Sequence, residues 1–306
     1  MRIVFRAIAI LLCMILLVGC APTTGDPPAG GDQPEGYEPP ARVALSPFVH
    51  FSFDDAEFCF INLKNNQYAS IWEEPFLSAL KRAHDDYGVK ISLYVWKDVL
   101  HDQSAAHVTE WQACADWLKI GLHSDGDGNF AEASYDVGRA AWEHFVADVY
   151  AMTGTYDIID RMPRLHNFAG SEESLRGMRD ATCGALGFLA ADDTRVSYSL
   201  GETGSTWLQA HDYLTDESGL TYLTTDLRCE RHKKDVFAEV LTEKFGRANE
   251  AECYILFTHE YEVYNGETVN EYFSWLDDMA LYFFENQIPF AFPADFAYPA
   301  TKGDIT

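Results

Sequence analysis

Strand-like and helix-like segments alternate along residues 42–306 of the chain. The first three units are VALSPFVHFSF with IWEEPFLSALKRAHDDYG, VKISLYVW with VTEWQACADWL, and KIGLH with SYDVGRAAWEHFVADVYAMTG. This alternation predicts a parallel sheet covered by helices, because parallel strands need a long crossover that is usually a helix. Seven or eight such units follow one another without a linker, so we expect a single domain with a closed (β/α) barrel of about seven parallel strands. An open doubly wound sheet is the alternative.

The second half of the domain continues the pattern less regularly. Strand-like runs lie at RMPRLHNF, ALGFLAADD, LTYLTTDLRCE and ECYILFTHE, with a last short one at IPFAF. Helical periodicity marks SEESLRGMRDATCG, DVFAEVLTEKFGRA and VNEYFSWLDDMALYFFENQ. In a parallel barrel, catalytic groups lie where strands end and the following loops begin.

The first 41 residues predict where the protein is located. Residues 1–19 combine two arginines with a long apolar run, and Leu17-Val18-Gly19-Cys20 is similar to a bacterial lipoprotein processing site. We expect a lipoprotein-type signal peptide over 1–19 and lipid attachment at Cys20, with an uncleaved signal anchor as the alternative. Residues 20–41 are rich in proline and glycine, which predicts a flexible linker. The domain is then extracytoplasmic and held on a bacterial membrane through Cys20 only.

Charge and cysteine content narrow the class of protein. The formal net charge of −26 argues against nucleic acid as a partner, because so acidic a surface repels phosphates. Five cysteines lie beyond Cys20 without CxxC spacing, which argues against a zinc knuckle. One disulfide, such as Cys183 with Cys229, is compatible with an exported protein. We expect a monomer.

Ionisable residues follow five of the predicted strands. They are Asp54 and Asp55 after FSF, His123 after KIGL, Arg164 and His166 in RMPRLH, Asp192 and Asp193 after GFLAA, and His259 and Glu260 after YILFT. A single charge at a strand end is common, but five sets around one rim favour a functional site. The adjacent carboxylates of Asp54 and Asp55 need a specific explanation, because two like charges at the end of an apolar strand are costly to bury.

FSFDDAE resembles the first motif of the polysaccharide deacetylases, the NodB-homology superfamily of carbohydrate esterase family 4 type, in which a strand ends in Thr/Ser-Phe-Asp-Asp. KIGLHSDGDG is similar to their second motif and ILFTHE to their last, in the same order along the chain. The resemblance covers most of the domain and marks the chain as a divergent relative. It implies a deformed, TIM-like (β/α) barrel, a divalent metal, and hydrolysis of N- or O-linked acetyl groups on a carbohydrate.

The resemblance also implies roles for individual residues. Asp55 and His123 would be metal ligands, Asp54 would take a proton from the attacking water, and His259 would protonate the leaving group. Glu260 would orient or tune His259. Zinc is the first expectation for the metal, because catalytic zinc takes three N or O ligands and keeps one open position; manganese, cobalt and nickel are alternatives. A cation also explains how two carboxylates are held side by side.

The second motif departs from the family at one ligand position. Four residues after His123, where the family has another histidine, this chain has Asp127. Aspartate can also bind a divalent metal, so the expected ligand set is Asp55, His123 and Asp127. His166 is the alternative third ligand.

The other rim residues are expected to bind substrate or to support the site: Arg161, Arg164, His166, Asp192, Asp193 and Glu260. Arg161 keeps the Arg-x-Pro spacing of the family's third motif in RMPRLH, whereas Arg164 departs from it. Purely structural roles are the alternative for each. Arg164 can pair with a carboxylate, the two aspartates after GFLAA can pair with Arg195, and the pair in FSFDDAE can serve as a helix cap and a turn residue.

Three functions remain open from the sequence. The first is a surface-tethered, metal-dependent hydrolase that removes acetyl groups from a carbohydrate. The second is a catalytically inactive lipoprotein of the same fold that binds a glycan, which the altered second and third motifs would explain. The third is a glycoside hydrolase that uses Asp54 and another rim carboxylate as acid and base.

Overall fold

The computed structural model describes residues 43–44, 47–126, 130–245, 253–264, 273–299 and 301. The predicted signal peptide, the linker with Cys20, and Asp127 lie outside these ranges. Within the described ranges, no helix has both the length and the apolar character needed to cross a membrane.

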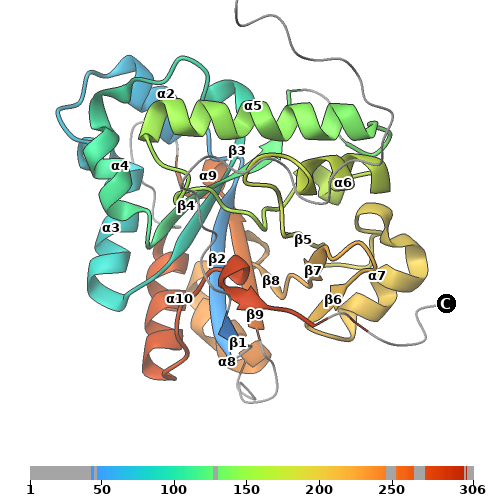
Figure 1. The fold of residues 1–306 in the computed structure, drawn as a ribbon. Helices are drawn as coiled ribbons and strands as arrows, with labels where there is room; N and C mark the ends of the chain where they lie inside the picture. Colours follow the sequence, from blue (N-terminus) through green and yellow to red (C-terminus); the bar gives the residue numbers. More distant parts are fainter. Residues whose placement is uncertain are drawn as a thin grey trace, which may run out of the picture.

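Strands and helices alternate through most of the described chain (Figure 1). The strands are β1 (Val43–Ala44), β2 (Phe48–Asp54), β3 (Ile91–Trp96), β4 (Leu118–Ser124), β5 (Gly187–Leu189), β6 (Tyr213–Thr215), β7 (Thr221–Leu223), β8 (Leu227–Arg228), β9 (Cys253–His259) and β10 (Phe296–Ala297). The helices are α2 (Phe58–Asn65), α3 (Pro75–Tyr87), α4 (Val108–Cys114), α5 (Tyr135–Thr153), α6 (Glu172–Arg179), α7 (Gly201–Gln209), α8 (Phe237–Phe245), α9 (Glu260–Val263) and α10 (Ser274–Glu285). Two 3₁₀ turns also contribute to the site, η4 (His166–Phe168) and η6 (Cys229–Arg231).

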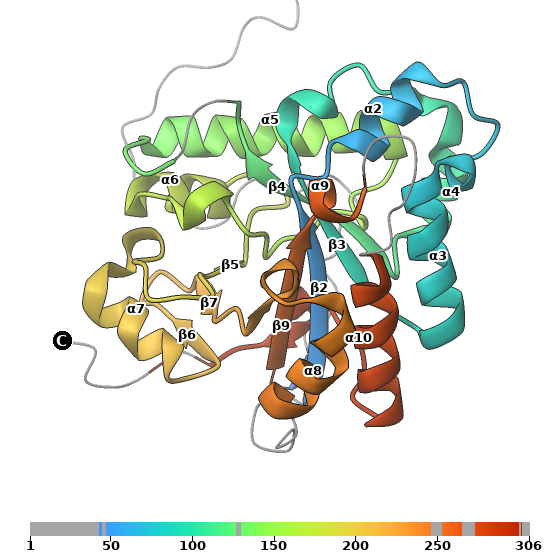
Figure 2. The same ribbon diagram turned by 180° about the vertical axis from the view of Figure 1, so that it is seen from behind.

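The largest sheet has five parallel strands in the order β4-β3-β2-β9-β8. β2 is central and pairs with β9 over all seven of its residues. Helices surround the strands: α3 and α10 lie on one side and α6 and α7 on the other, while α5 runs across the top of the view (Figures 1 and 2).

A second set of strands completes a ring around one interior. β5 pairs in parallel with β7, and β6 adds to β7 in antiparallel orientation. The segment 158–164 joins this set to the main sheet, because its backbone bonds Ile120 of β4 on one side and Leu186 and Leu189 on the other at 2.7–3.0 Å. β7, the middle strand of this set, continues through residues 224–226 into β8, which pairs with β9. The predicted α/β barrel of about seven strands is confirmed, in a deformed form in which one member is not a regular strand.

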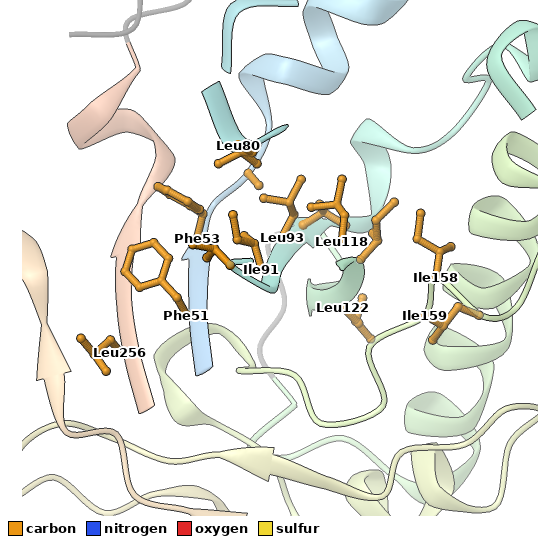
Figure 3. Close-up of a cluster of buried hydrophobic side chains, with 14 of the residues drawn as sticks. Phe51, Phe53, Leu80, Ile91, Leu93, Leu118, Leu122, Ile158, Ile159 and Leu256 are labelled. Carbon is orange, nitrogen blue, oxygen red and sulfur yellow. The ribbon is translucent and has the colours of Figure 1, made fainter. Parts of the chain in front are cut away.

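Alternation along β2 places apolar and polar residues on opposite faces. Phe51 and Phe53 belong to the hydrophobic core between strands and helices, together with Leu80 of α3 (Figure 3). Ser52 and Asp54 face the barrel interior, and all seven residues of β2 are buried. Burial on both faces is typical of a strand in a parallel barrel. The polar inner face is what makes this interior suitable for chemistry.

Local signals explain why α3 begins and ends where it does. The side chain of Glu74 accepts a hydrogen bond from the backbone N–H of Leu77, and Pro75 occupies the first turn, where its missing N–H costs nothing. The helix ends at Gly88, whose left-handed φ of 71° suits glycine. These caps lie inside the run IWEEPFLSALKRAHDDYG, from which a helix was predicted.

Two predicted strands are not regular strands. RMPRLHNF begins within the segment 158–164 and then turns into η4, where Asn167 and Phe168 have φ angles of 57° and 54°. Pro163 has no N–H to donate and the two left-handed residues turn the chain, so a continuous ladder cannot form. IPFAF forms one bridge, between Phe290 and Val49, instead of a strand.

The disulfide considered from the sequence is not present. Cys183 and Cys229 are both buried and both have free thiols. Burial raises the pKa of each thiol, so these cysteines behave as small apolar core residues.

Candidate active site

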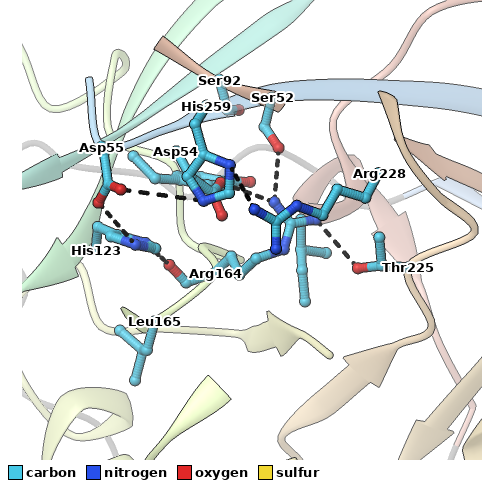
Figure 4. A network of polar contacts seen from close by, with 12 residues as sticks. Ser52, Asp54, Asp55, Ser92, His123, Arg164, Leu165, Thr225, Arg228 and His259 are labelled. Atoms are coloured by element: carbon cyan, nitrogen blue, oxygen red, sulfur yellow. Dashed lines mark hydrogen bonds and ion pairs between the residues drawn. The ribbon is translucent and has the colours of Figure 1, made fainter. Parts of the chain in front are cut away.

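Three strand ends bring together the two predicted catalytic residues, Asp54 and His259, and two of the predicted metal ligands, Asp55 and His123. Asp54 ends β2 and lies opposite His259, the last residue of β9, in the parallel register. Asp55 follows with a left-handed φ of 51°, which aspartate tolerates better than most residues. Its carboxylate lies 3.3 Å from Nε2 of His123 at the end of β4 and 4.0 Å from Nε2 of His259 (Figure 4). Two carboxylates and two imidazoles therefore share one end of the barrel.

A β-bulge gives His123 its position. Val95 of β3 pairs with Leu122 of β4, but the next residue, Trp96, pairs with Ser124. His123 is thus one extra residue in β4, and a bulge of this kind redirects the side chain that it carries. The imidazole lies inside the barrel mouth and is 3% exposed.

The hydrogen bonds of His123 determine which nitrogen carries its proton. Nδ1 lies 2.7 Å from the backbone carbonyl oxygen of Arg164, which can only accept, so Nδ1 is the donor. In the neutral ring, Nε2 then presents its lone pair to Oδ1 of Asp55 at 3.3 Å. Two acceptors this close are stable only with a cation or a proton between them. A histidine that donates its other nitrogen to a backbone carbonyl is typical of metal sites.

Arg164 holds Asp54 inside the barrel. Nη1 of Arg164 donates to Oδ1 of Asp54 at 2.8 Å and to Oγ of Ser52 at 3.0 Å, and Nη2 donates to Thr225 at 3.1 Å. The guanidinium also lies 4.0 Å from the ring centroid of Phe257. This cation compensates the buried charge of Asp54 and restricts the carboxylate to one place. Arg164 is therefore part of the site, although it departs from the family's motif.

His259 is paired with a residue that the sequence did not single out. Its Nδ1 lies 2.6 Å from Oε1 of Glu230 in η6, and Arg228 donates to the same glutamate. Burial alone would lower the pKa of His259, but the hydrogen bond to Glu230 and the charge of Asp54 raise it above its usual value. Burial likewise opposes ionisation of Glu230, yet its bonds to His259 and the charge of Arg228 lower its pKa to about 2. The arrangement favours a protonated His259.

Glu260, which was expected to orient or tune His259, bonds the backbone of another element. Its carboxylate accepts hydrogen bonds from the backbone N–H groups of Glu57, Phe58 and Cys59, at 2.5, 2.7 and 2.9 Å. These are the unpaired donors at the start of α2, which favour an anion. Glu260 therefore attaches α2 to the end of β9, and Glu230 makes the contact with His259.

The third metal ligand is the least defined part of the site. His166 in η4 is near, since its ring centroid lies 5.4 Å from that of His123. Burial, and then the neighbouring His123, lower the pKa of His166, which favours the neutral ring that a metal needs. Within the described part of the chain, no three side chains of His, Cys, Asp or Glu converge closely enough to hold a metal. Asp127, the other predicted ligand, lies outside that part.

The remaining predicted residues have local partners. Nε of Arg161 donates to the backbone carbonyl of Gly184 at 2.8 Å. Asp193 pairs with Arg195 at 2.6 Å, and this hydrogen-bonded arginine lowers the pKa of Asp193 to about 2. Asp192 pairs with Arg231 at 2.7 Å. Of the two aspartates, only Asp193 has the arginine partner that the structural alternative named, Arg195, whereas Asp192 pairs with Arg231.

Two residues of the site were missed from the sequence, Glu230 and Trp96. Glu230 lies two residues after the end of β8, so the rule that functional groups follow strands would have found it in LTYLTTDLRCE. Trp96 ends β3, but a tryptophan there reads as core or stacking surface. Its indole Nε1 instead donates to Oδ1 of Asp55 at 2.7 Å.

No family model matches the sequence, and no curated protein matches it. Several solved structures are similar. A candidate polysaccharide deacetylase from Mycobacterium smegmatis is 12% identical with a TM-score of 0.47, over 86% of this chain and 99% of that one. A carbohydrate esterase family 4 pseudoenzyme from Bacillus anthracis is 13% identical with a TM-score of 0.41, over 83% and 66%.

A third similar structure is a family 4 acetyl xylan esterase from Clostridium thermocellum, crystallised with a cobalt ion. It is 16% identical with a TM-score of 0.36, over 69% of this chain and 87% of that one. Likenesses at these levels assign no activity, metal or residue role to this chain. The relation of this chain to the polysaccharide deacetylases is therefore the resemblance of its motifs FSFDDAE, KIGLHSDGDG and ILFTHE.

Proposed function

We propose that the protein is a metal-dependent hydrolase that removes acetyl groups from a carbohydrate. One observation carries this proposal: Nδ1 of His123 donates to a backbone carbonyl, so in the neutral ring Nε2 and Oδ1 of Asp55 face each other at 3.3 Å as two acceptors. A divalent cation between them would resolve that repulsion, and the left-handed backbone of Asp55 is a conformation of the kind that functional sites retain.

The donor set suits such a cation. Asp55 supplies a carboxylate, His123 supplies Nε2, and either His166 or Asp127 would be the third ligand. Nitrogen and oxygen donors in this number suit zinc, with manganese, cobalt and nickel as alternatives. When bound, the cation would polarise the acyl carbonyl and make a water molecule acidic near neutral pH.

The protein's own side chains supply the proton transfers. Asp54, held by Arg164, would accept a proton from the attacking water. His259, kept protonated by Glu230, would donate a proton to the leaving amine or alcohol. The two lie in register on adjacent strands, so acceptor and donor flank one position at the barrel mouth. Burial of Asp54 limits competing contacts with bulk water.

The test is release of acetate from a panel of N- and O-acetylated glycans. The metal-loaded protein should release acetate from at least one of them, and Asp54→Asn should reduce the rate by roughly 10²–10⁴-fold. Asp193→Asn is the matched control, because Asp193 pairs with Arg195 beside β5 and should keep full activity. No acetate release from any glycan, with the metal bound, would contradict the proposal.

A glycan-binding protein without catalysis is the second candidate. The presence of Asp127 where the family has a histidine favours it, since a weaker ligand set can lose the metal while the barrel persists. Binding of a glycan without acetate release would support this candidate. In either case the proposed partner is a carbohydrate. The proposed location is extracytoplasmic, with a lipid on Cys20 as the membrane anchor.

A further inference from the structure

Trp96 contacts the site but has no part in the chemistry proposed so far. It ends β3, directly opposite the bulge that carries His123. Its indole N–H donates to Oδ1 of Asp55 at 2.7 Å. That oxygen is the one that faces Nε2 of His123.

The surroundings of Trp96 differ from those of a core tryptophan. Trp111 and Trp142 are fully buried in the hydrophobic core. Trp96 is half-buried, and its ring contacts two imidazoles: the centroid distance is 4.9 Å to His166 and 6.3 Å to His123. One side chain therefore touches all of the described residues considered as metal ligands.

The indole N–H has a specific effect on Asp55. It donates only and carries no charge, so it occupies one side of Oδ1 without neutralising the carboxylate. It also fixes a side chain whose backbone has a left-handed φ of 51° and would otherwise be free to turn. A side chain that orients a metal ligand in this way typically changes metal affinity by about 10–100-fold when it is removed.

The backbone around Trp96 is held to the strand that carries His123. Lys97, the next residue, forms an ion pair with Asp125 in the loop after β4. Trp96 itself pairs with Ser124 across the bulge. The indole and the imidazole are thus carried by one connected piece of the barrel mouth, so their relative positions are preset.

We infer that Trp96 is a positioning residue for a divalent cation bound by Asp55 and His123, and that its ring confines His166 beside them. This inference rests on the metal site of the proposed function. It does not depend on which acyl group or which glycan the protein acts on.

The test is calorimetric titration of the metal-free protein with Zn²⁺ and with Co²⁺, together with the visible absorption spectrum of the Co²⁺ form. Trp96→Phe keeps a ring but removes the N–H, and it should bind both cations about 10–100-fold more weakly with an altered Co²⁺ spectrum. Trp96→His restores an N–H donor and should recover part of the affinity. Trp72→Phe is the matched control, because Trp72 stacks on Trp117 with centroids 5.7 Å apart and should leave affinity unchanged.

The outcomes separate this inference from the proposed function. Unchanged affinity and spectrum in Trp96→Phe overturn it. Unchanged affinity with a raised KM for an acetylated glycan also overturns it, and makes Trp96 a substrate platform. If Trp96→Phe binds the cations more weakly than the wild type, and the wild type releases no acetate, the positioning role is supported and the hydrolase proposal fails. A wild-type protein that binds neither cation overturns both.

Discussion

Nη1 of Arg164 lies 2.8 Å from Oδ1 of Asp54 inside the barrel, and the two side chains are only 1% and 3% exposed. Removing one partner of such a pair leaves the other charge buried without compensation. Arg164→Met should therefore lower the free energy of unfolding by roughly 3–5 kcal/mol, measured by chemical denaturation. The double variant Arg164→Met, Asp54→Asn should recover part of that loss, because it no longer buries an unpaired carboxylate.

A surface pair provides the control for this experiment. Arg176 of α6 pairs with Glu173 at 2.9 Å, and both side chains are exposed. Arg176→Met should change the free energy of unfolding by less than about 1 kcal/mol. If the double variant is no more stable than Arg164→Met alone, the cost does not come from the unpaired charge of Asp54.

Glu230→Gln should shift the pH dependence of catalysis. Glu230 raises the pKa of His259 through its hydrogen bond and its charge, so the variant should have a lower His259 pKa. Because His259 acts as an acid in the proposed reaction, the alkaline limb of the pH–rate profile should move to lower pH. NMR titration of the His259 ring measures the same shift directly. An unchanged profile would show that Glu230 does not control this proton.

Glu260→Ala should affect stability without affecting that profile. Three backbone N–H groups at the start of α2 lose their acceptor, which should cost roughly 1–3 kcal/mol of unfolding free energy. Chemical denaturation and the pH–rate profile together distinguish the role of Glu230, which sets the pKa of His259, from that of Glu260, which binds the start of α2. A shifted profile in Glu260→Ala would restore the role for Glu260 that the sequence first suggested.

Asp226 lies at the junction of β7 and β8, and its carboxyl group should make the free energy of unfolding depend on pH. Its carboxylate accepts from the backbone N–H of Ile255 at 2.8 Å, and desolvation raises its pKa from 3.8 to about 7. Since the folded pKa is above the unfolded one, the folded state binds the proton more tightly. This contribution to stability is complete below about pH 4 and is lost as the pH rises through 7.

Asp226→Asn tests this directly, because asparagine keeps an oxygen for Ile255 and carries no charge. At pH 8 the variant should exceed the wild type in unfolding free energy by about 1 kcal/mol or more, and the difference should shrink toward pH 4. A difference that does not change with pH would contradict the shifted pKa.

Much of the fold was predictable from local patterns. The apolar runs of β2, β3, β4 and β9 and the capped helix α3 carry their own signals, and their order predicts a parallel barrel. The structure of segment 158–164 was harder to predict, because its strand-like pairing is interrupted by Pro163 and by the left-handed residues of η4. IPFAF reads as a strand, but whether an apolar run pairs over several residues depends on neighbours that the sequence does not specify.

The site residues likewise divide into those that the sequence predicts and those that it does not. Asp54, Asp55, His123 and His259 could be proposed because each follows an apolar run and resembles a family motif. Which side chains pair with them could not be predicted, since the pairing depends on how segments distant in sequence come together: Arg164 reaches Asp54 across 110 positions, and Glu230 reaches His259 across 29. The contacts of Glu260 could not be predicted either: it is adjacent to His259 in sequence, but its carboxylate bonds the backbone at the start of α2.

The central claim is that Asp55 and His123 bind a divalent cation, and metal binding by the purified protein tests it most directly. After chelation and reloading, the wild-type protein should bind one zinc ion per chain, as measured by calorimetry and elemental analysis. Asp55→Ala and His123→Ala should each lose most of that affinity while remaining folded. A wild-type protein that binds no divalent cation, or a double variant that retains full metal content, would contradict the account.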